Sequence, residues 1–498
     1  MAGLAAVGSC QAEGDGASRD GDWPEWGGSP SKNMVSRATG IPIDFDPGKR
    51  KKGSWEINLA TTRRCDWVAK IGSRCFGTPT VAAGKVLIGT DNGSPRDHRV
   101  NGYRGVLMCF DEKTGNFEWQ LIVRGLSSVV GGIDSRGMCS SALIHRNRAY
   151  VVTNRCQVMC LDLDGLADGN DGPFQREANL YADRFEPPAE LSKADADVIW
   201  IFDMRSELGV FPHGEIVGSP TLVDGKLAVT TANGTDWSHT NVPSPDAPCL
   251  ITLDPETGKL IGEDRARIGA GTLHNNWSSP SAGKIDGEPA IFFGGGDGFA
   301  YSFDPDPVED DEGFLVYPEN WRIDGNPPEY RRGKKFGHDG GPSEIIGTPV
   351  LHKGHIYFAI GQDHETGKGP GMLSCVDAKT GERVWESKEV GRSMSTPSIV
   401  GGLLYIADFR GHVHCFDVKS GKRYWSFDTG RQIWGSTLVV DGKVLVGNED
   451  GELVILAAGK DARELARVEF ETPIYSTPVV ANGRIYIATQ ANLFAFRK

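Results

Sequence analysis

The sequence predicts an all-β protein, an eight-bladed β-propeller built from four-stranded antiparallel blades. Three observations predict it: a segment that recurs eight times, four short alternating strands within each repeat, and an unusual glycine content. The chain has 498 residues, of which 65 are glycine, where an average protein of this length has roughly 35. Hydrophobic residues make up 39% of the chain, so disordered and collagen-like classes are excluded.

The repeat opens with a small residue, then Ser or Thr, and in most copies Pro. The eight copies begin at Gly77, Ser140, Gly218, Ser278, Gly347, Ser395, Gly435 and Ser476. The sixth copy contains four alternating runs, STPSIV, LLYIAD, HVHCFD and KRYWSFD, separated by turn residues. Alternation with period two predicts strands, and four antiparallel strands per repeat form the blade of a propeller.

Turns with a conserved spacing account for the glycine excess. An Asp is followed four residues later by a Gly in the segments 111–115, 254–258, 377–381 and 417–421, a pattern typical of tight turns that need a positive φ. Trp119, Trp385 and Trp425 follow three of these turns. We expect each of these indoles on an outer strand, packed against the next blade.

The two ends of the chain predict how the ring closes. The eighth repeat stops at Lys498 after three strands, and Ser54–Leu59 reads as an outer strand without its three partners. Pairing them removes two exposed sheet edges. We therefore expect one domain from residue 22 to residue 498, closed by the N-terminal strand.

The first 21 residues predict a signal remnant and flexible tether. Val7-Gly8-Ser9-Cys10 resembles the end of a bacterial lipoprotein signal, which predicts a lipid anchor at Cys10 and a place in the periplasm or cell envelope; the alternative is a featureless tail. No run reaches the ~18 apolar residues of a membrane span. The net charge of −13 argues against nucleic acid as a partner.

Cysteines follow the same repeat. Cys109, Cys160, Cys375 and Cys415 occupy one third-strand position, which predicts buried thiols. Cys75 and Cys139 each precede a first strand on neighbouring blades, and a bridge between them is left open.

One face of the ring carries the long links. The links over 91–105, 233–248 and 361–371 join second to third strands, and 325–346 precedes the fifth blade, so all four decorate the same rim. Loops on a rigid scaffold usually carry function. We therefore expect a small ligand or a protein partner on this face, at the mouth of the channel.

The position four residues before each conserved Ser or Thr defines a ring of candidate side chains. It contains Arg74, Gly137, Glu215, Asn275, Glu344, Arg392, Gln432 and Pro473. The oxygen donors Glu215, Asn275 and Glu344 are candidate metal ligands of the kind Ca²⁺ prefers. Arg74, Arg392 and Arg431 are candidates for holding an acidic ligand, with Trp277, Trp434, His213 and His274 beside them. The alternative is that these polar groups only line a water-filled channel.

Longer phrases resemble a known family. DWPEWGGSP over 22–30, CFGTPTV, GVLMCFDEKTG, ELGVFPH, HNNWSSPS and GQDHETGKGPG are similar to the PQQ-like β-propeller repeat, and in particular to exported PQQ-binding-like repeat proteins of planctomycete-type bacteria. The wider family includes quinoprotein alcohol dehydrogenases and the propeller lipoprotein of the outer-membrane assembly machinery.

The resemblance implies two functions. The first is an exported propeller acting as a ligand-binding or protein-binding module in the cell envelope. The alternative is an oxidoreductase that uses PQQ and Ca²⁺, in which Glu215, Trp237, Asn275, Asp297 and Arg392 would follow the family's order, with Asp297 as the candidate catalytic residue. The vicinal cysteine pair of the dehydrogenases is missing from the sequence.

Overall fold

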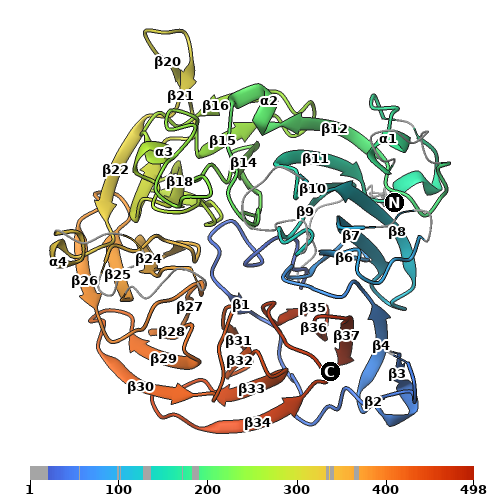
Figure 1. Cartoon of the computed structure of the whole chain (residues 1–498). Helices are drawn as coiled ribbons and strands as arrows, with labels where there is room; N and C mark the ends of the chain where they lie inside the picture. The colour runs from blue at the N-terminus through green and yellow to red at the C-terminus, as the bar shows by residue number, and fades with distance from the viewer. Residues whose placement is uncertain are drawn as a thin grey trace, which may run out of the picture.

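Eight small antiparallel sheets form a closed ring, and the predicted eight-bladed propeller is confirmed (Figure 1). The computed structural model describes residues 21–498 except 55, 98–99, 101, 127–135, 171, 182–189, 333–335, 337–340 and 364–369. The predicted tether and the lipid anchor at Cys10 therefore fall outside the described residues.

Each blade contributes four strands, numbered from the channel outward. Blade 1 contains β5 (Thr80–Ala82), β6 (Lys85–Asp91), β7 (Arg104–Asp111) and β8 (Phe117–Arg124). Blade 2 contains β9 (Leu143–His145), β10 (Arg148–Val152), β11 (Gln157–Asp162) and β12 (Val198–Asp203). Blade 3 contains β13 (Thr221–Val223), β14 (Lys226–Thr230), β15 (Leu250–Leu253) and β16 (Leu260–Glu263). Blade 4 contains β17 (Ser281–Ile285), β18 (Glu288–Gly294), β19 (Phe299–Phe303) and β22 (Glu319–Asp324).

The second half of the ring follows the same plan. Blade 5 contains β23 (Val350–His352), β24 (His355–Ile360), β25 (Met372–Asp377) and β26 (Arg383–Ser387). Blade 6 contains β27 (Ser398–Val400), β28 (Leu403–Ala407), β29 (His412–Asp417) and β30 (Arg423–Asp428). Blade 7 contains β31 (Leu438–Val440), β32 (Lys443–Gly447), β33 (Glu452–Ala457) and β34 (Glu464–Glu469). Blade 8 contains β35 (Val479–Ala481), β36 (Arg484–Ala488), β37 (Asn492–Arg497) and β4 (Cys65–Lys70).

Short elements decorate the links between strands. The helical turns are η1 (Leu59–Thr61), η3 (Gly165–Ala167), α1 (Ala178–Tyr181), α2 (Met204–Leu208), α3 (Ile268–Gly271) and α4 (Pro328–Arg331). The short strands β2 (Lys49–Arg50) and β3 (Ile57–Asn58) pair with each other, and β20 (Val308–Glu309) and β21 (Leu315–Val316) extend blade 3. No helix in the described ranges has the length and apolar character needed to cross a membrane.

The ring closes between the two ends of the chain, but through a different strand from the one expected. The N-terminal partner of β37 is β4, whose Cys65–Lys70 segment pairs antiparallel with it. The predicted segment Ser54–Leu59 is wrong as the outer strand, because its Ile57 and Asn58 pair with β2 outside the ring. The alternating pattern of Ser54–Leu59 resembles that of a blade strand. The indole position of the outer strand of blade 8 is occupied by Trp67 in β4.

The indoles of the outer strands join neighbouring blades. Each donates its N–H to a backbone carbonyl in the turn of the next blade at 2.9–3.1 Å, as Trp119, Trp385 and Trp425 were expected to pack. The six indoles are Trp67, Trp119, Trp200, Trp321, Trp385 and Trp425.

The glycine of the receiving turn is required on two grounds. Gly381 has a φ of +72°, and a Cβ at this position would lie 2.7 Å from the Trp321 ring. In blade 3 the outer strand carries Gly262 at the indole position. Tyr317, which follows β21, fills that space and bonds Thr252 through its hydroxyl at 2.8 Å.

The thiols lie inside this packing. Cys109, Cys160, Cys375 and Cys415 are buried, and each pairs across strands with an outer-strand tryptophan. All nine described cysteines are free. The bridge left open between Cys75 and Cys139 is therefore absent.

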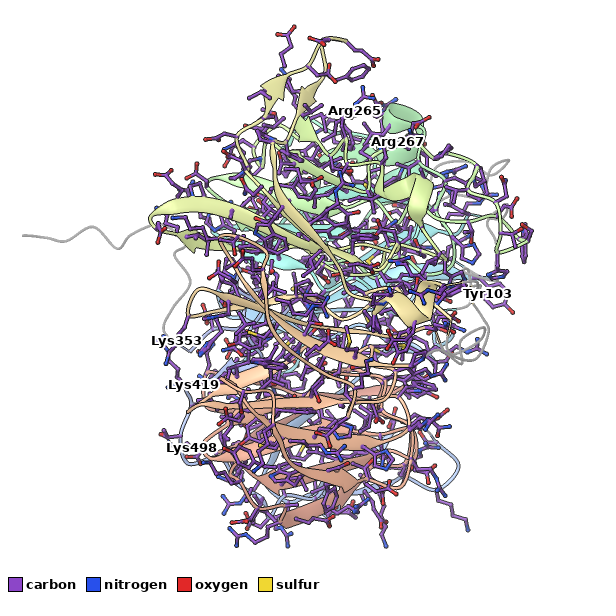
Figure 2. The ribbon with its side chains drawn as sticks, turned by 90° about the vertical axis from the view of Figure 1, so that its left-hand side faces the viewer. Tyr103, Arg265, Arg267, Lys353, Lys419 and Lys498 are labelled. Atoms are coloured by element: carbon purple, nitrogen blue, oxygen red, sulfur yellow. The ribbon has the colours of Figure 1, made fainter. Side chains whose placement is uncertain are left out.

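The two faces of the ring differ in their links. First and second strands join through tight turns such as Lys353-Gly354, with φ values of +50° and +75°, the geometry of a type I′ hairpin. Figure 2 shows Lys353 and Lys419 on one face and Tyr103, from the β6–β7 link, on the other. The long links therefore surround one mouth of the channel.

Residues 21–36, here called the central segment, cross the middle of the ring (Figure 1). They bond at least once to every blade. The contacts are Trp23 with Val81, Pro24 with Ile144, Glu25 with Thr221, Pro30 with Ala282, Ser31 with Leu351, Asn33 with Ile399, Met34 with Val439 and Ser36 with Val480. Strand β1 (Val35–Ser36) even adds in parallel to β31. The central segment thereby closes the channel from within.

The central segment contains a buried ion pair. Lys32 is 0% and Glu25 4% exposed, their side chains bond to each other, and Thr221 Oγ1 donates to Glu25 at 2.6 Å. Burial lowers the pKa of Lys32, although Glu25 opposes this effect. The pair anchors the central segment to blade 3.

Gly381→Ala should destabilise the fold more than Gly354→Ala. Both glycines have a positive φ, which costs an alanine about 1 kcal/mol. Only the Gly381 Cβ would meet the Trp321 ring; at Gly354 no described atom lies within 4 Å. Urea unfolding should give an extra loss of about 1–3 kcal/mol for Gly381→Ala. Equal losses would contradict the blade-docking role of this turn.

Lys32→Met should lower the free energy of unfolding by about 3–5 kcal/mol, because Glu25 would be left charged and buried. The double variant Glu25→Gln with Lys32→Met should lose less, since no unpaired charge remains. The measurement is urea unfolding of the two single variants and the double variant at pH 7. A double variant less stable than Lys32→Met would contradict the idea that the unpaired charge of Glu25 causes the loss.

Candidate functional site

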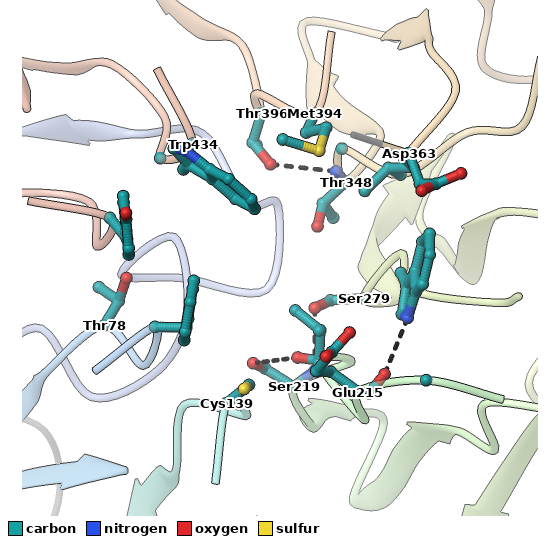
Figure 3. A pocket seen from close by; sticks show the side chains of 18 of the residues that line it. Thr78, Cys139, Glu215, Ser219, Ser279, Thr348, Asp363, Met394, Thr396 and Trp434 are labelled. Atoms are coloured by element: carbon teal, nitrogen blue, oxygen red, sulfur yellow. Dashed lines mark hydrogen bonds between the residues drawn. The ribbon is translucent and has the colours of Figure 1, made fainter. Parts of the chain in front are cut away.

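A cavity of about 350 Å³ occupies the centre of the ring on the face of the long links (Figure 3). Trp26 of the central segment lies at its base and donates its indole N–H to Thr348 Oγ1 at 3.1 Å. Because the central segment crosses the channel below, the cavity is open at one mouth only. We call it the central cavity.

A ring of hydroxyl side chains forms the lower wall of the central cavity. It consists of the conserved Ser or Thr of each repeat: Thr78, Ser141, Ser219, Ser279, Thr348, Thr396, Ser436 and Thr477. In six places the backbone N–H of one blade donates to the hydroxyl of the next at 2.8–3.1 Å. Figure 3 shows one such bond, between Thr348 and Thr396. A hydroxyl recurs at this position of every repeat because it joins neighbouring blades around the channel.

The upper wall is apolar and belongs to the residues two positions before each hydroxyl. All eight line the central cavity: Phe76, Cys139, Val217, Trp277, Ile346, Met394, Trp434 and Tyr475. Extended backbone points alternate residues to the same side, so this register and the hydroxyl register share the channel face. Sequence reasoning chose the polar register two positions further out. Alternation alone does not separate the two registers, because both point to the same side of extended backbone; of the polar register only Glu215 lines the central cavity.

An ion pair lies at the mouth. Arg136 contacts Glu215 at 3.0 Å, and its guanidinium lies 5.6 Å from the centre of the Phe76 ring. The Glu215 carbonyl accepts the Trp277 indole N–H at 2.8 Å. Arg136, which sequence reasoning missed, thus supplies a cation to the lining of the central cavity. It lies one residue before the predicted ring position Gly137.

The structure divides the predicted ligand-binding residues. Glu215, Trp277 and Trp434 line the central cavity. Arg74 lines a separate hollow beside blade 1. Arg431 is exposed and pairs with Asp450 at 2.6 Å, and Arg392 donates to the Asp363 carbonyl at 2.9 Å. These three arginines therefore do not line the central cavity.

Each of the three predicted calcium ligands bonds within the protein. Glu215 pairs with Arg136. Asn275 Oδ1 accepts the N–H of Asn276 at 2.7 Å, and its amide group donates to the carbonyl of His213. Glu344 is fully buried and accepts the N–H of Asn275 at 3.4 Å. A hard cation held by all three would have to displace Arg136 from Glu215 and break the bonds of Asn275.

Asp297, the candidate catalytic residue, is buried in the link between β18 and β19. Its carboxylate accepts the hydroxyl of Tyr301 and the N–H of Phe299, and it does not belong to the lining of the central cavity. Burial raises the pKa of Asp297 to about 6. Its observed contacts are those of a residue that supports the blade 4 rim.

Three histidines meet at the mouth beside a pair of acids. His213, His239 and His274 line the central cavity together with Asp363, and Glu344 lies next to Asp363 behind His274. His239 and Asp363 were not expected from the sequence, because they come from long links whose course no local pattern fixes.

Fold and cavity define the chain as an eight-bladed propeller with a blind central cavity. Residues 341–427 match the model of the family described as outer membrane protein assembly factor BamB, which confirms the resemblance to PQQ-like propeller repeats. No curated protein matches the sequence.

Solved structures share the fold at low identity. BamB from Moraxella catarrhalis is 13% identical, with a TM-score of 0.54, covering 87% of this chain and 98% of that one. Quinohemoprotein alcohol dehydrogenase from Comamonas testosteroni is 15% identical, with a TM-score of 0.59, covering 97% and 81%. A europium-containing methanol dehydrogenase is 13% identical, with a TM-score of 0.57, covering 95% and 90%.

Asp297→Asn should change how stability depends on pH. Between about pH 4 and pH 6 the folded protein holds a proton on Asp297 that the unfolded chain has lost, so the free energy of unfolding falls as the pH rises. The raised pKa corresponds to about 3 kcal/mol. Asparagine carries no charge and still accepts from Tyr301. The free energy of unfolding of the variant should therefore rise relative to that of the wild type as the pH increases over this interval. Thermal unfolding against pH measures it, with the exposed Asp311→Asn as control; parallel curves would contradict the assignment.

Proposed function

We propose that this chain is a ligand-binding propeller that takes a small ring-bearing ligand in the central cavity. One observation carries the proposal: the central segment closes the channel, so the ring encloses a blind cavity of about 350 Å³. Cavities of about 300–1,000 Å³ with apolar walls and a few polar groups are typical of small-molecule sites. A protein partner has no such need of a closed channel.

The lining defines the chemistry of the ligand. Trp277, Trp434, Phe76 and Tyr475 offer aromatic faces to a flat or ring-shaped molecule, and such faces favour stacking. The hydroxyl ring below offers hydrogen bonds. Arg136 at the mouth favours a ligand with an acidic group, which would compete with Glu215 for the guanidinium. A flat anion with polar edges satisfies all three.

The alternative is a PQQ-dependent oxidoreductase. Two of the structural neighbours are named as alcohol or methanol dehydrogenases, and PQQ is a flat quinone with carboxylate groups, which suits the aromatic walls and Arg136. The predicted calcium ligands Glu215, Asn275 and Glu344 are less suited, because each is bonded within the protein. Binding of the quinone is therefore better supported than a calcium site built from these three residues.

The cell envelope is the proposed location. The lipobox-like sequence ending at Cys10 supports a lipid anchor, and the match of residues 341–427 to a family described as an outer membrane protein assembly factor supports a place in the envelope. The net charge of −13 supports a partner other than nucleic acid.

Trp237→Ala should weaken ligand binding about fivefold. Trp237 is 64% exposed at the mouth of the central cavity, so its removal deletes a stacking face worth about 1 kcal/mol without opening the core. Tyr103→Ala is the matched control, because Tyr103 is 69% exposed on the same face outside the central cavity. Quenching of tryptophan fluorescence by PQQ, aromatic acids and oligosaccharides measures the affinity.

The outcomes separate the two functions. Binding without dye-linked oxidation of alcohols supports the binding module. PQQ binding with turnover supports the oxidoreductase. No saturable quenching by any probe, or equal losses for Trp237→Ala and Tyr103→Ala, would overturn the assignment of the central cavity as the ligand site.

A further inference from the structure

Three histidine rings from three different links converge at the mouth of the central cavity. The ring centres of His213 and His274 are 4.3 Å apart, and His239 lies 4.8 Å from each. One nitrogen from each ring lies within 4.8 Å of the other two. The three imidazole rings come from the links before β13, β15 and β17. These positions do not recur from blade to blade, so the blade repeat does not explain why the rings lie together.

The hydrogen bonds of His213 determine which nitrogen is available. Its Nδ1 lies 2.6 Å from the carbonyl oxygen of Thr235. A carbonyl only accepts, so Nδ1 carries the proton and Nε2 keeps its lone pair. A backbone carbonyl on the second nitrogen is the usual arrangement of a metal-binding histidine.

His274 is oriented in the same way by acids. Its Nδ1 lies 3.4 Å from Asp363 Oδ2 and 4.0 Å from Glu344 Oε1. Two carboxylates on this side favour a proton on Nδ1, so the lone pair of Nε2 is directed away from the acids. The carboxylate–histidine pair is again the outer arrangement of many metal sites.

Two buried polar atoms beside the three rings favour a nearby cation. Glu344 is 0% exposed, and its Oε1 has no hydrogen-bond partner within the ranges that the structure describes; the same holds for His239 Nδ1. A buried polar atom without a partner is costly, and a nearby cation removes that cost for the carboxylate.

The backbone at His239 is held in an unfavourable conformation. Its φ is +54°, a region that residues with a Cβ seldom adopt. The His239 N–H donates to the Asp236 carbonyl at 3.0 Å. This hydrogen bond closes the turn that places the His239 ring beside His213 and His274.

We propose that His213, His239 and His274 bind one divalent transition-metal ion, with Zn²⁺ as the best match. Nitrogen ligands favour Zn²⁺ and its neighbours over Ca²⁺, which prefers oxygen. Asp363 and Glu344 orient His274 and balance the charge. Nitrogens bound to Zn²⁺ at about 2.1 Å lie about 3.4 Å apart, so the rings need to move by about 1 Å or less each.

The fourth position of this site faces the central cavity, because all three rings line it. Three protein ligands and one open position are typical of zinc sites that bind water or a substrate oxygen. This proposal does not depend on the proposed function, because the metal is expected to bind without any organic ligand.

The test uses the full chain freed of metal by a chelator and titrated with Zn²⁺ alone by calorimetry, and with Co²⁺ followed by its visible absorption. The wild type should bind one ion, with the intense bands of four-coordinate Co²⁺. His239→Gln should weaken binding roughly 100-fold and Asp363→Asn roughly tenfold. His145→Gln, on the opposite face at the end of β9, should bind like the wild type.

His239→Gln lies on a surface link, and an unchanged melting temperature in the absence of metal would establish that it folds. The proposed site would be overturned by any of three results: wild-type affinity for Zn²⁺ in this folded variant, octahedral Co²⁺ spectra in the wild type, or binding of Ca²⁺ in preference to Zn²⁺. Failure of the organic probes in the fluorescence experiment would leave this result unaffected.

Discussion

The fit of an outer-strand indole against the glycine turn of the next blade is the contact on which the ring depends. At five of the six Trp junctions it combines a directed hydrogen bond with a ring face that only glycine can approach, so it fixes both the spacing and the angle between blades; at Trp425 the hydrogen bond alone is present. Six junctions use Trp, and at blade 3 Tyr317 fills the same space from an inserted hairpin. Because the blade angle decides how many blades close a ring, this contact also sets the width of the channel.

The central segment turns that channel into a cavity. A propeller ring of this width leaves an opening lined by first strands, whose edge N–H and carbonyl groups need partners. Residues 21–36 supply bonds to all eight blades, and the buried pair of Glu25 and Lys32 fixes their course. The base of the cavity, Trp26, is thus positioned by the same contacts that complete the inner sheet edges.

The central cavity and the histidine cluster rest on different parts of the fold. The walls of the central cavity come from the repeat, through the apolar and hydroxyl registers that lead into the first strands, and are therefore rigid. The cations, imidazoles and carboxylates at the mouth come from links that differ in every blade. This division lets a uniform ring present an irregular site: the walls favour flat apolar surfaces, and the mouth supplies charge and metal-binding nitrogen on one side, near blades 3 to 5.

The sequence by itself determined the number of blades, the four strands of each, the turn glycines and the burial of the repeated thiols, because each depends on local alternation and turn chemistry. It placed Glu215, Trp277 and Trp434 at the channel for the same reason. The tertiary structure alone decided that β4 closes the ring in place of Ser54–Leu59, that residues 21–36 fill the channel, and that Arg136, His239 and Asp363 meet at the mouth. These depend on long-range packing: a two-residue pairing outside the ring looks locally like a blade strand, and the path of a long link is set by what it packs against.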